Sequence, residues 1–320
     1  MALKAQYFPT VTPHEGFNPE EDAAAIKKAM KGMGCDEGPI VAILSKRCIK
    51  QRVQIAECYK REYGKDLAED LKKELGGDLE TIMMALTYSY FEYLARELQS
   101  AFKGMSTKEK VVLDIILTRN NAEMHLLQDT YSKKCHSTLD EAVRKGMKGD
   151  IEKLLVSILS GSRDETDRVD QQKAKQQAQD LYKAGEKKLG TNEEAFRNIF
   201  ASESLPQLLA IEKEYEAISK KTLQEAIKSE LSGSFQKALL ILLAVAKDKV
   251  EYYADCLYDS MQGAGTDDKT LIRIVVSRSE LDLGAIKAKY LEKYGKTLDH
   301  SIERETSGAY KNALLALVRG

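Results

Sequence analysis

The chain contains four copies of one module, and this repetition constrains its fold more than any other feature. Each copy starts at a small residue, continues to a leucine and then reaches a glycine, with spacings that are identical in all four copies. The starting residues are Gly34, Ser106, Gly190 and Gly265, the leucines are Leu67, Leu139, Leu223 and Leu298, and the glycines are Gly77, Gly149, Gly233 and Gly308. The distance from one copy to the next varies, so insertions fall only between copies. This pattern predicts one supersecondary unit repeated four times.

Within each copy the apolar residues follow a helical period. The first copy has Ile40, Ile43 and Leu44 at i, i+3 and i+4, which is one apolar face of a helix. The equivalent residues of the other copies are Val112, Ile115 and Ile116, then Phe196, Ile199 and Phe200, then Leu271, Ile274 and Val275. A tyrosine also recurs at one position of every copy, as Tyr59, Tyr131, Tyr215 and Tyr290. We expect all these positions to be core and the chain to be all-α.

Several local patterns are typical of helix starts. Asn18 before Pro19 predicts the start of the first helix. Ser106 with Glu109, and Thr191 with Glu194, have the spacing of capping boxes.

Composition limits the classes of function. The 320 residues carry 49 basic and 50 acidic side chains, for a formal net charge of −1. Such a balance argues against nucleic-acid binding by bulk electrostatics and against polybasic attachment to acidic membranes. Five cysteines without regular spacing favour free thiols. No run is long enough to span a bilayer and Met1–Gly16 lacks a secretory pattern, so we expect a cytoplasmic protein, while secretion by a route that needs no signal peptide stays open.

A carboxylate recurs at one place in three of the four modules. Glu74, Glu230 and Glu305 stand at the same distance from the start of their modules, whereas the second module has Gly146 at this position. The first residue of each module is the last residue of a short glycine-rich loop. Glycine allows such a loop to turn its backbone carbonyls toward one point. Several carbonyl oxygens with one bidentate carboxylate form a hard-oxygen site that suits Ca²⁺ and leaves coordination positions for water or a phosphate oxygen.

The loop motifs resemble those of the annexin family over about Phe17 to Gly320. Met261-Gln-Gly-Ala-Gly-Thr266 and Val276-Ser-Arg-Ser279 are the most specific matches. The resemblance implies an all-α fold of four five-helix annexin modules arranged as a slightly curved disc, with Ca²⁺ loops that dock onto acidic phospholipid such as phosphatidylserine. It also implies the metal ligands, which are Met30, Gly32, Gly34 and Glu74 in module one, Gly185, Lys188, Gly190 and Glu230 in module three, and Met261, Gly263, Gly265 and Glu305 in module four.

Two modules depart from the family pattern. Module two has Ser106 in place of the last loop glycine and Gly146 in place of the acid, so we expect its site to be lost or very weak. Module one has Cys35 where threonine is expected, and a redox role for this thiol stays open. The apolar residues at the loop tips, Met33, Leu189 and Ala264, are candidates for contact with lipid acyl chains.

The sequence predicts six segments. They are an N-terminal arm at 1–16, annexin repeats at 17–87, 88–160, 171–247 and 248–320, and a polar linker at 161–170. We interpret this linker as the joint between two halves of two modules each. The arm lies outside the repeats and is a candidate for setting the choice of a protein partner, while self-association on membranes stays open.

Two rival functions remain at this point. One is a helical-repeat scaffold that binds proteins through structural loops. The other is an ion path, because the resemblance brings Asp114 and Arg273 together in a polar centre with Glu97 and Arg119; a salt-bridge network explains the same residues. Arg47, Arg119 and Arg278 occupy one module position at which module three has Glu203, so its local pairing should differ. The four histidines show no metal-ligand spacing and no P-loop or nucleophile–base pattern occurs, so we expect no enzyme.

Overall fold

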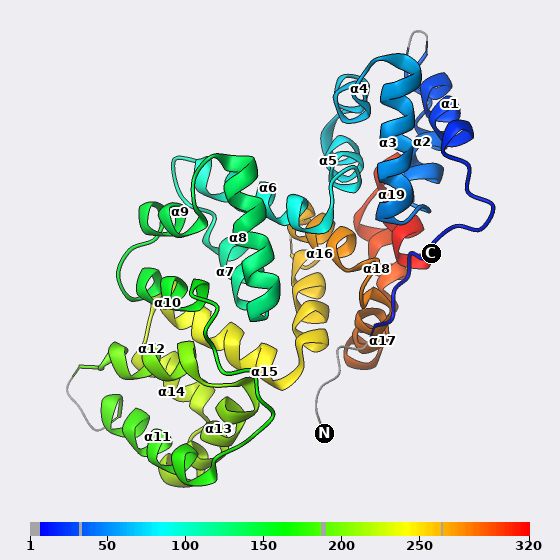
Figure 1. The fold of residues 1–320 in the computed structure, drawn as a ribbon. Helices are drawn as coiled ribbons and strands as arrows, with labels where there is room; N and C mark the ends of the chain where they lie inside the picture. Colours follow the sequence, from blue (N-terminus) through cyan, green and yellow to red (C-terminus); the bar gives the residue numbers. More distant parts are fainter. Residues whose placement is uncertain (1–6, 32–33, 187–189, 264) are drawn as a thin grey trace. The chain divides into compact units, whose positions relative to one another are not determined.

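Every regular element in the described part of the chain is a helix (Figure 1). The computed structural model describes residues 7–31, 34–186, 190–263 and 265–320. These residues form nineteen α-helices and no strand. The prediction of an all-α fold is confirmed.

The helices repeat in groups of five once the long α15 is divided at its kink. Module one contains α1 (Pro19–Ala29), α2 (Glu37–Leu44), α3 (Ile49–Tyr63), α4 (Leu67–Glu74) and α5 (Gly77–Leu86). Module two contains α6 (Tyr90–Lys103), α7 (Glu109–Leu117), α8 (Asn121–Cys135), α9 (Leu139–Gly146) and α10 (Asp150–Leu159). Module three contains α11 (Gln171–Ala184), α12 (Glu193–Ser202), α13 (Leu205–Ser219), α14 (Leu223–Glu230) and the first part of α15 (Gly233–Ser260). Module four contains the rest of α15 with α16 (Asp268–Arg278), α17 (Leu283–Tyr294), α18 (Leu298–Glu305) and α19 (Gly308–Arg319).

The kink in α15 lies at Asp248, where the backbone leaves the helical region at φ −161° and ψ 105°. The Asp248 carboxylate accepts hydrogen bonds from the backbone N–H groups of Val250 (2.8 Å) and Glu251 (3.1 Å). This is the arrangement of an N-cap, so a new helix begins here for the fourth module.

The capping predictions are partly right. Asn18 caps α1, with Pro19 at the first helical position. The two capping boxes after the loops are wrong, because α7 is preceded by Lys108 and α12 is capped by Asn192. The hydroxyl of Thr191, and that of Thr107 beside Ser106, bond instead to the carbonyls of Glu230 (2.9 Å) and Gly146 (2.8 Å). These hydroxyls thus hold each loop to the C-terminal end of a later helix, α9 or α14, instead of starting a helix.

The chain divides into two compact units. One contains the described residues up to Tyr93 and from Tyr253 onward, and the other runs from Leu94 to Tyr252. The first unit therefore holds modules one and four, and the second holds modules two and three. The interpretation that 161–170 joins two separate halves is wrong, because this segment runs inside the second unit. There Asp164 N–H donates to the carbonyl of Ser202 (2.9 Å), which ties the segment to α12.

The predicted core is buried in all four modules. Tyr59, Tyr215 and Tyr290 are fully buried, and Tyr131 is 3% exposed. Of the apolar helix positions predicted to be core, only Ile43 is partly exposed. Burying each such side chain contributes about 1.5–3 kcal/mol relative to leaving it exposed.

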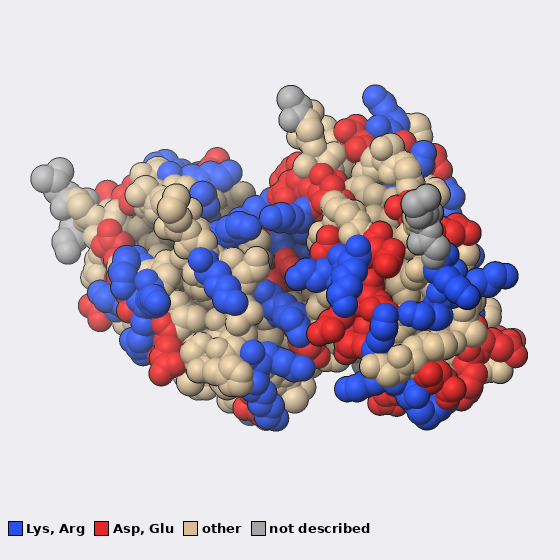
Figure 2. Space-filling model, turned by 90° about the horizontal axis from the view of Figure 1, so that it is seen from above, with Lys and Arg blue, Asp and Glu red and all other residues tan. Residues whose placement is uncertain are grey.

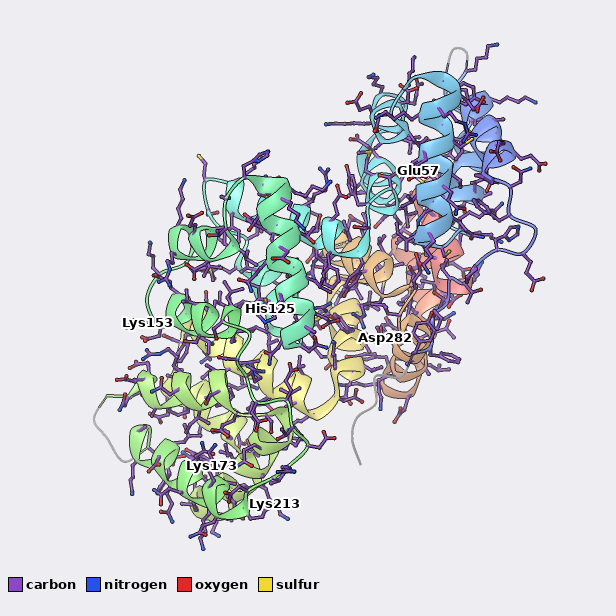
Figure 3. The ribbon with its side chains drawn as sticks, in the orientation of Figure 1. Glu57, His125, Lys153, Lys173, Lys213 and Asp282 are labelled. Carbon is purple, nitrogen blue, oxygen red and sulfur yellow. The ribbon has the colours of Figure 1, made fainter. Side chains whose placement is uncertain are left out.

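The charged residues at the module position of Arg47, which is Glu203 in module three, pair locally. Arg47 holds Asp22 through two hydrogen bonds of 2.7 and 3.0 Å. In module three the charges are exchanged, because Glu203 accepts hydrogen bonds from Lys173 (2.8 Å; labelled in Figure 3) and Gln177 (2.9 Å). The expected difference in pairing is confirmed.

Among the described residues, no helix combines the length and the hydropathy that a membrane span requires.

Candidate calcium and lipid site

Each module closes its first interhelical loop with the same backbone hydrogen bond. The N–H of the residue just before the second helix donates to a carbonyl in the last turn of the first helix. The pairs are Asp36 to Ala29 (2.9 Å), Lys108 to Ala101 (3.0 Å), Asn192 to Ala184 (2.8 Å) and Asp267 to Ser260 (2.7 Å). The same backbone hydrogen bond therefore closes this loop in all four modules.

The last glycine of the loop has a positive φ in modules one, three and four, a conformation that glycine adopts more easily than other residues. Gly34, Gly190 and Gly265 have φ values of +92°, +90° and +101°. Ser106, at the same position of module two, does not have a positive φ, since His136 and Lys220 are the described non-glycine residues that do. Side-chain crowding makes the left-handed region costly for serine, so the module-two loop turns differently.

Module four shows the complete pair of loop and carboxylate. A cavity of about 280 Å³ is lined by the loop residues Met261 and Gly263 and by Glu305, the last residue of α18. The rest of the lining is Gln262, Lys296, His300, Ser301 and Arg304. Thr266 donates its hydroxyl to the Glu305 carbonyl at 3.4 Å, which fixes the helix end against the loop. The two predicted halves of this site face one small polar cavity.

Module three brings its carboxylate to its loop through two contacts. The Thr191 hydroxyl lies 2.9 Å from the Glu230 carbonyl and 3.3 Å from its carboxylate Oε2. A Cβ at Gly185 would lie 3.1 Å from Glu230 Cγ, so the side chain passes directly over this glycine. A larger residue at 185 would displace the carboxylate.

Module one has a thiol, Cys35, at the position of the threonine hydroxyl. Burial raises the pKa of Cys35, and the negative charges of Glu74, Glu37 and Asp36 raise it further. Glu74, the last residue of α4, is thus close enough to the loop to act on Cys35. Asp36 caps α2 through Gly38 N–H at 3.3 Å, so helix capping survives the change to cysteine.

Module two has neither the acid nor room for it. A Cβ at Gly146 would lie 2.6 Å from the ring of Phe102 and 2.9 Å from the Thr107 hydroxyl. The ring therefore occupies the space through which a carboxylate side chain would pass in the other modules. The donor set at this position does not fit a metal ion.

The donor chemistry of the other three modules does fit Ca²⁺. Each combines a glycine loop with one carboxylate oxygen donor, and hard oxygen ligands are those that Ca²⁺ prefers. Among the described residues no group of three or more His, Cys, Asp or Glu side chains could hold a metal. Any ion here would therefore rely mainly on backbone carbonyls, water and outside ligands.

Some predicted ligands lie outside the described residues. These are Gly32 in module one and Lys188 in module three, together with the apolar loop residues Met33, Leu189 and Ala264. Sequence reasoning missed the bridging threonines, although Thr107, Thr191 and Thr266 each follow a module start directly. It also missed the basic residues of the module-four cavity.

The structure shows the local partners of Asp114, Arg119 and Arg273, which the sequence analysis assigned to a polar centre. In the second unit Asp114 is buried and accepts a hydrogen bond from the Tyr252 hydroxyl, and Arg119 contacts Glu123 at 3.6 Å. In the first unit Arg273 is buried beside Thr270. Tyr252 thus supplies a partner for Asp114 that the sequence did not suggest.

Fold and site together define a four-module helical repeat protein with loop–carboxylate sites in three modules. The family model described as Annexin matches residues 21–86, 93–158, 176–242 and 252–317. The chain belongs to the annexin family, whose members bind phospholipid in a Ca²⁺-dependent manner and are generally not enzymes.

Individual relatives agree over nearly the whole length. Annexin A8-like protein 1 from Homo sapiens is 44% identical over 310 residues, covering 97% of this chain and 95% of that protein. The structure of annexin III is similar with a TM-score of 0.94 at 37% identity, covering 100% of this chain and 99% of that one. The structure of calcium-bound annexin (Sm)1 is similar with a TM-score of 0.80 at 32% identity, covering 98% and 93%.

Proposed function

We propose that this protein binds acidic phospholipid membranes through Ca²⁺ held in modules one, three and four. The carbonyls of the glycine loops and the carboxylates of Glu74, Glu230 and Glu305 bind the ion on one side. Lipid phosphate, or the carboxylate of phosphatidylserine, completes its coordination shell. A bound Ca²⁺ supplies the positive charge that attracts the headgroup.

The module-four cavity carries this proposal. Met261, Gly263 and Glu305 come from separate parts of the chain and line one polar cavity of about 280 Å³. One carboxylate neutralises only half of the charge of Ca²⁺, so the bound ion keeps vacant positions and attracts an anionic ligand. The calcium-bound relative annexin (Sm)1 shares the fold, which supports a metal at these loops.

Several weak sites in one protein predict a steep response. Lipid that completes the coordination shell raises Ca²⁺ affinity by the factor by which Ca²⁺ raises lipid affinity. Sites that engage one surface together also add avidity. We therefore propose a cytoplasmic protein that moves to membranes when Ca²⁺ rises, without catalytic turnover.

Co-sedimentation with vesicles tests the proposal at about 0.15 M salt, where long-range attraction is screened. Wild type should pellet with phosphatidylserine-containing vesicles in Ca²⁺, but not with chelator and not with pure phosphatidylcholine. The Glu74/Glu230/Glu305→Gln variant should stay in the supernatant. A charge-matched control is Glu57/Glu216/Glu292→Gln, which changes exposed glutamates in the same three modules; Glu57 lies on α3 (Figure 3).

Unchanged pelleting of the site variant would overturn the bridging mechanism. Equal loss in both glutamine variants would show that only net charge matters. If wild type fails to pellet in Ca²⁺, the scaffold function becomes the leading hypothesis.

A further inference from the structure

Module two has lost its carboxylate and has gained a dense group of cations at the same place. Its residues 103–110 and 144–149, which comprise the loop and the adjoining helix ends and are here called the module-two basic face, carry six cations and one anion, a net charge of +5. The cations are Lys103, Lys108, Lys110, Arg144, Lys145 and Lys148, and the anion is Glu109. The equivalent segments of modules one, three and four have net charges of 0, 0 and −2.

Whole-chain charge conceals this imbalance. Figure 2 shows acidic and basic side chains interspersed over the face in view, as expected for a net charge of −1. A total of −1 gives no sign of a polybasic membrane contact. One module nevertheless differs from its three relatives by at least five charges over matched positions.

The two segments of the basic face adjoin and point their cations to solvent. The Thr107 hydroxyl donates to the Gly146 carbonyl at 2.8 Å, which joins the segments. All six cationic side chains are exposed. Arg144 is held by Asp140 at 2.6 Å, whereas the one anion, Glu109, accepts a hydrogen bond from the Ser234 hydroxyl.

The cations are present at a local cost to the fold. Asp36, Asn192 and Asp267 cap the second helix of the other modules, and each accepts a backbone hydrogen bond. Lys108 stands at this position in module two and makes no side-chain cap bond. A lysine at a helix N-terminus also opposes the helix dipole. Local stability alone would not favour lysine here, so binding is the simpler explanation.

An apolar tip stands among these charges. The Met105 side chain is fully exposed, and it lies between Lys103 and Lys108 in the loop. Cations around a protruding apolar side chain suit the interface of an anionic bilayer, where the charges meet phosphates and the thioether enters the acyl boundary. A purely polyanionic partner such as RNA would give Met105 no comparable environment.

We infer that the module-two basic face is a Ca²⁺-independent contact site for anionic phospholipid, with Met105 as its apolar anchor. The inference goes beyond the Ca²⁺-bridged contacts proposed above and uses none of their ligands. Attraction of this kind is strong at low ionic strength and weak at physiological salt. It therefore assists the Ca²⁺ switch without replacing it.

The test is vesicle binding in chelator at about 0.01 M salt, where the Debye length is about 30 Å. Wild type should bind phosphatidylserine vesicles, and raising the salt to about 0.15 M should release it. The Lys103/Lys145/Lys148→Gln variant should bind roughly a hundredfold more weakly, from the known effect of each cation at a lipid surface. The control Lys133/Lys175/Lys213→Gln removes three exposed lysines elsewhere in the same unit and should bind like wild type.

Met105→Ser separates a bilayer from other polyanions. We expect roughly tenfold weaker vesicle binding, because the anchor loses its apolar burial. No vesicle binding by wild type, or equal losses in both lysine variants, would overturn the inference. So would RNA binding that Met105→Ser leaves unchanged while vesicles do not bind.

The Glu74/Glu230/Glu305→Gln variant tests the two proposals separately, because it removes the Ca²⁺ ligands and leaves the basic face unchanged. It should keep its binding in chelator at low salt and lose its Ca²⁺-dependent pelleting at about 0.15 M salt. If wild type does not bind vesicles in chelator at low salt but still pellets with Ca²⁺, the basic face is refuted. If wild type binds in chelator but does not pellet with Ca²⁺, the Ca²⁺ bridge is refuted.

Discussion

The ring of Phe102 lies where a side chain at position 146 would begin, with Phe102 Cδ1 2.6 Å from the place of a Cβ on Gly146. Module two therefore differs from the other modules by more than one missing acid. Its loop serine also lacks the left-handed backbone of Gly34, Gly190 and Gly265. Three separate features oppose a metal site there.

Restoring the acid alone should therefore fail. Gly146→Glu must displace the Phe102 ring, so we expect about 1–3 kcal/mol lower stability and no additional Ca²⁺ bound. Calorimetric titration with Ca²⁺ and thermal unfolding measure the two effects. Phe102→Ala/Gly146→Glu should recover part of the stability. A single variant that binds one more ion at wild-type stability would contradict this account.

The thiol in module one leads to a second prediction. Thr191 and Thr266 donate a hydroxyl to the carbonyl of their carboxylate residue, whereas Cys35 offers only the weak S–H donor. Cys35→Thr should add about 0.5–1.5 kcal/mol of stability and tighten Ca²⁺ binding severalfold. The measurement uses a Glu230→Gln/Glu305→Gln background, in which module one is the remaining site. Thr191→Val should act in the opposite direction on module three, and an unchanged Cys35→Thr affinity would refute the role of the hydroxyl.

Much of this architecture could be predicted from the sequence, because the module repeats without internal gaps. Leu67, Tyr59 and their equivalents fixed the helices and the core, and Glu74, Glu230 and Glu305 could be found by counting. The pairing of modules into units could not, since it depends on contacts between distant segments. The space filled by Phe102 was equally hidden, because Met30 and Met261 stand at the equivalent positions of modules one and four and do not indicate where an aromatic ring would lie.

The local charge of module two could be predicted from the sequence only in part. It is visible in the sequence once matched segments are compared, but a total of −1 averages it away. Only the structure shows that Thr107 and Gly146 join the two segments and that Met105 is fully exposed.

A third prediction concerns the pH dependence of module one. Asp70 accepts hydrogen bonds from Tyr59 (2.8 Å) and Lys27 (3.3 Å). Burial alone would raise the pKa of Asp70, but these two hydrogen bonds lower it below its ordinary value. A depressed folded-state pKa means that Asp70 stabilises the fold above its unfolded pKa of about 3.9, and that this stability is lost as the pH falls through the folded value.

Asp70→Asn should therefore cost about 1.5–3 kcal/mol at pH 7, because hydrogen bonds to a charged group are lost. The difference from wild type should shrink as the pH falls below about 4. Urea unfolding of both proteins at several pH values measures it. A difference that stays constant with pH would show that the ionised carboxylate is not the cause.

The N-terminal arm gives a fourth prediction. Phe8 N–H donates to the Leu281 carbonyl and Gly284 N–H donates to the Phe8 carbonyl, both at 2.9 Å. A Cβ at Gly284 would lie 2.7 Å from that carbonyl oxygen and would also meet the Phe8 ring. Gly284→Ala should therefore release the arm at Phe8 and speed its proteolysis, at a cost of about 1–3 kcal/mol.

Phe8→Ala is the matched change, since it removes the ring and leaves Gly284 in place. It should release the arm less than Gly284→Ala, because the backbone hydrogen bonds remain. Equal protection of the arm in wild type and Gly284→Ala would contradict the close approach.

The last prediction separates stability from binding at Lys108. Asp36 and Asp267 cap α2 and α16, whereas Lys108 makes no side-chain cap bond at α7. Lys108→Asp should restore the cap and complement the helix dipole, so we expect about 1 kcal/mol higher stability in urea unfolding. The same change should weaken binding to acidic vesicles in chelator at low salt and raise the Ca²⁺ concentration needed for pelleting. Lys108→Gln should weaken binding less, since it removes the charge without adding an opposite one. A variant that becomes more stable and binds as well as wild type would show that Lys108 has no part in the lipid contact.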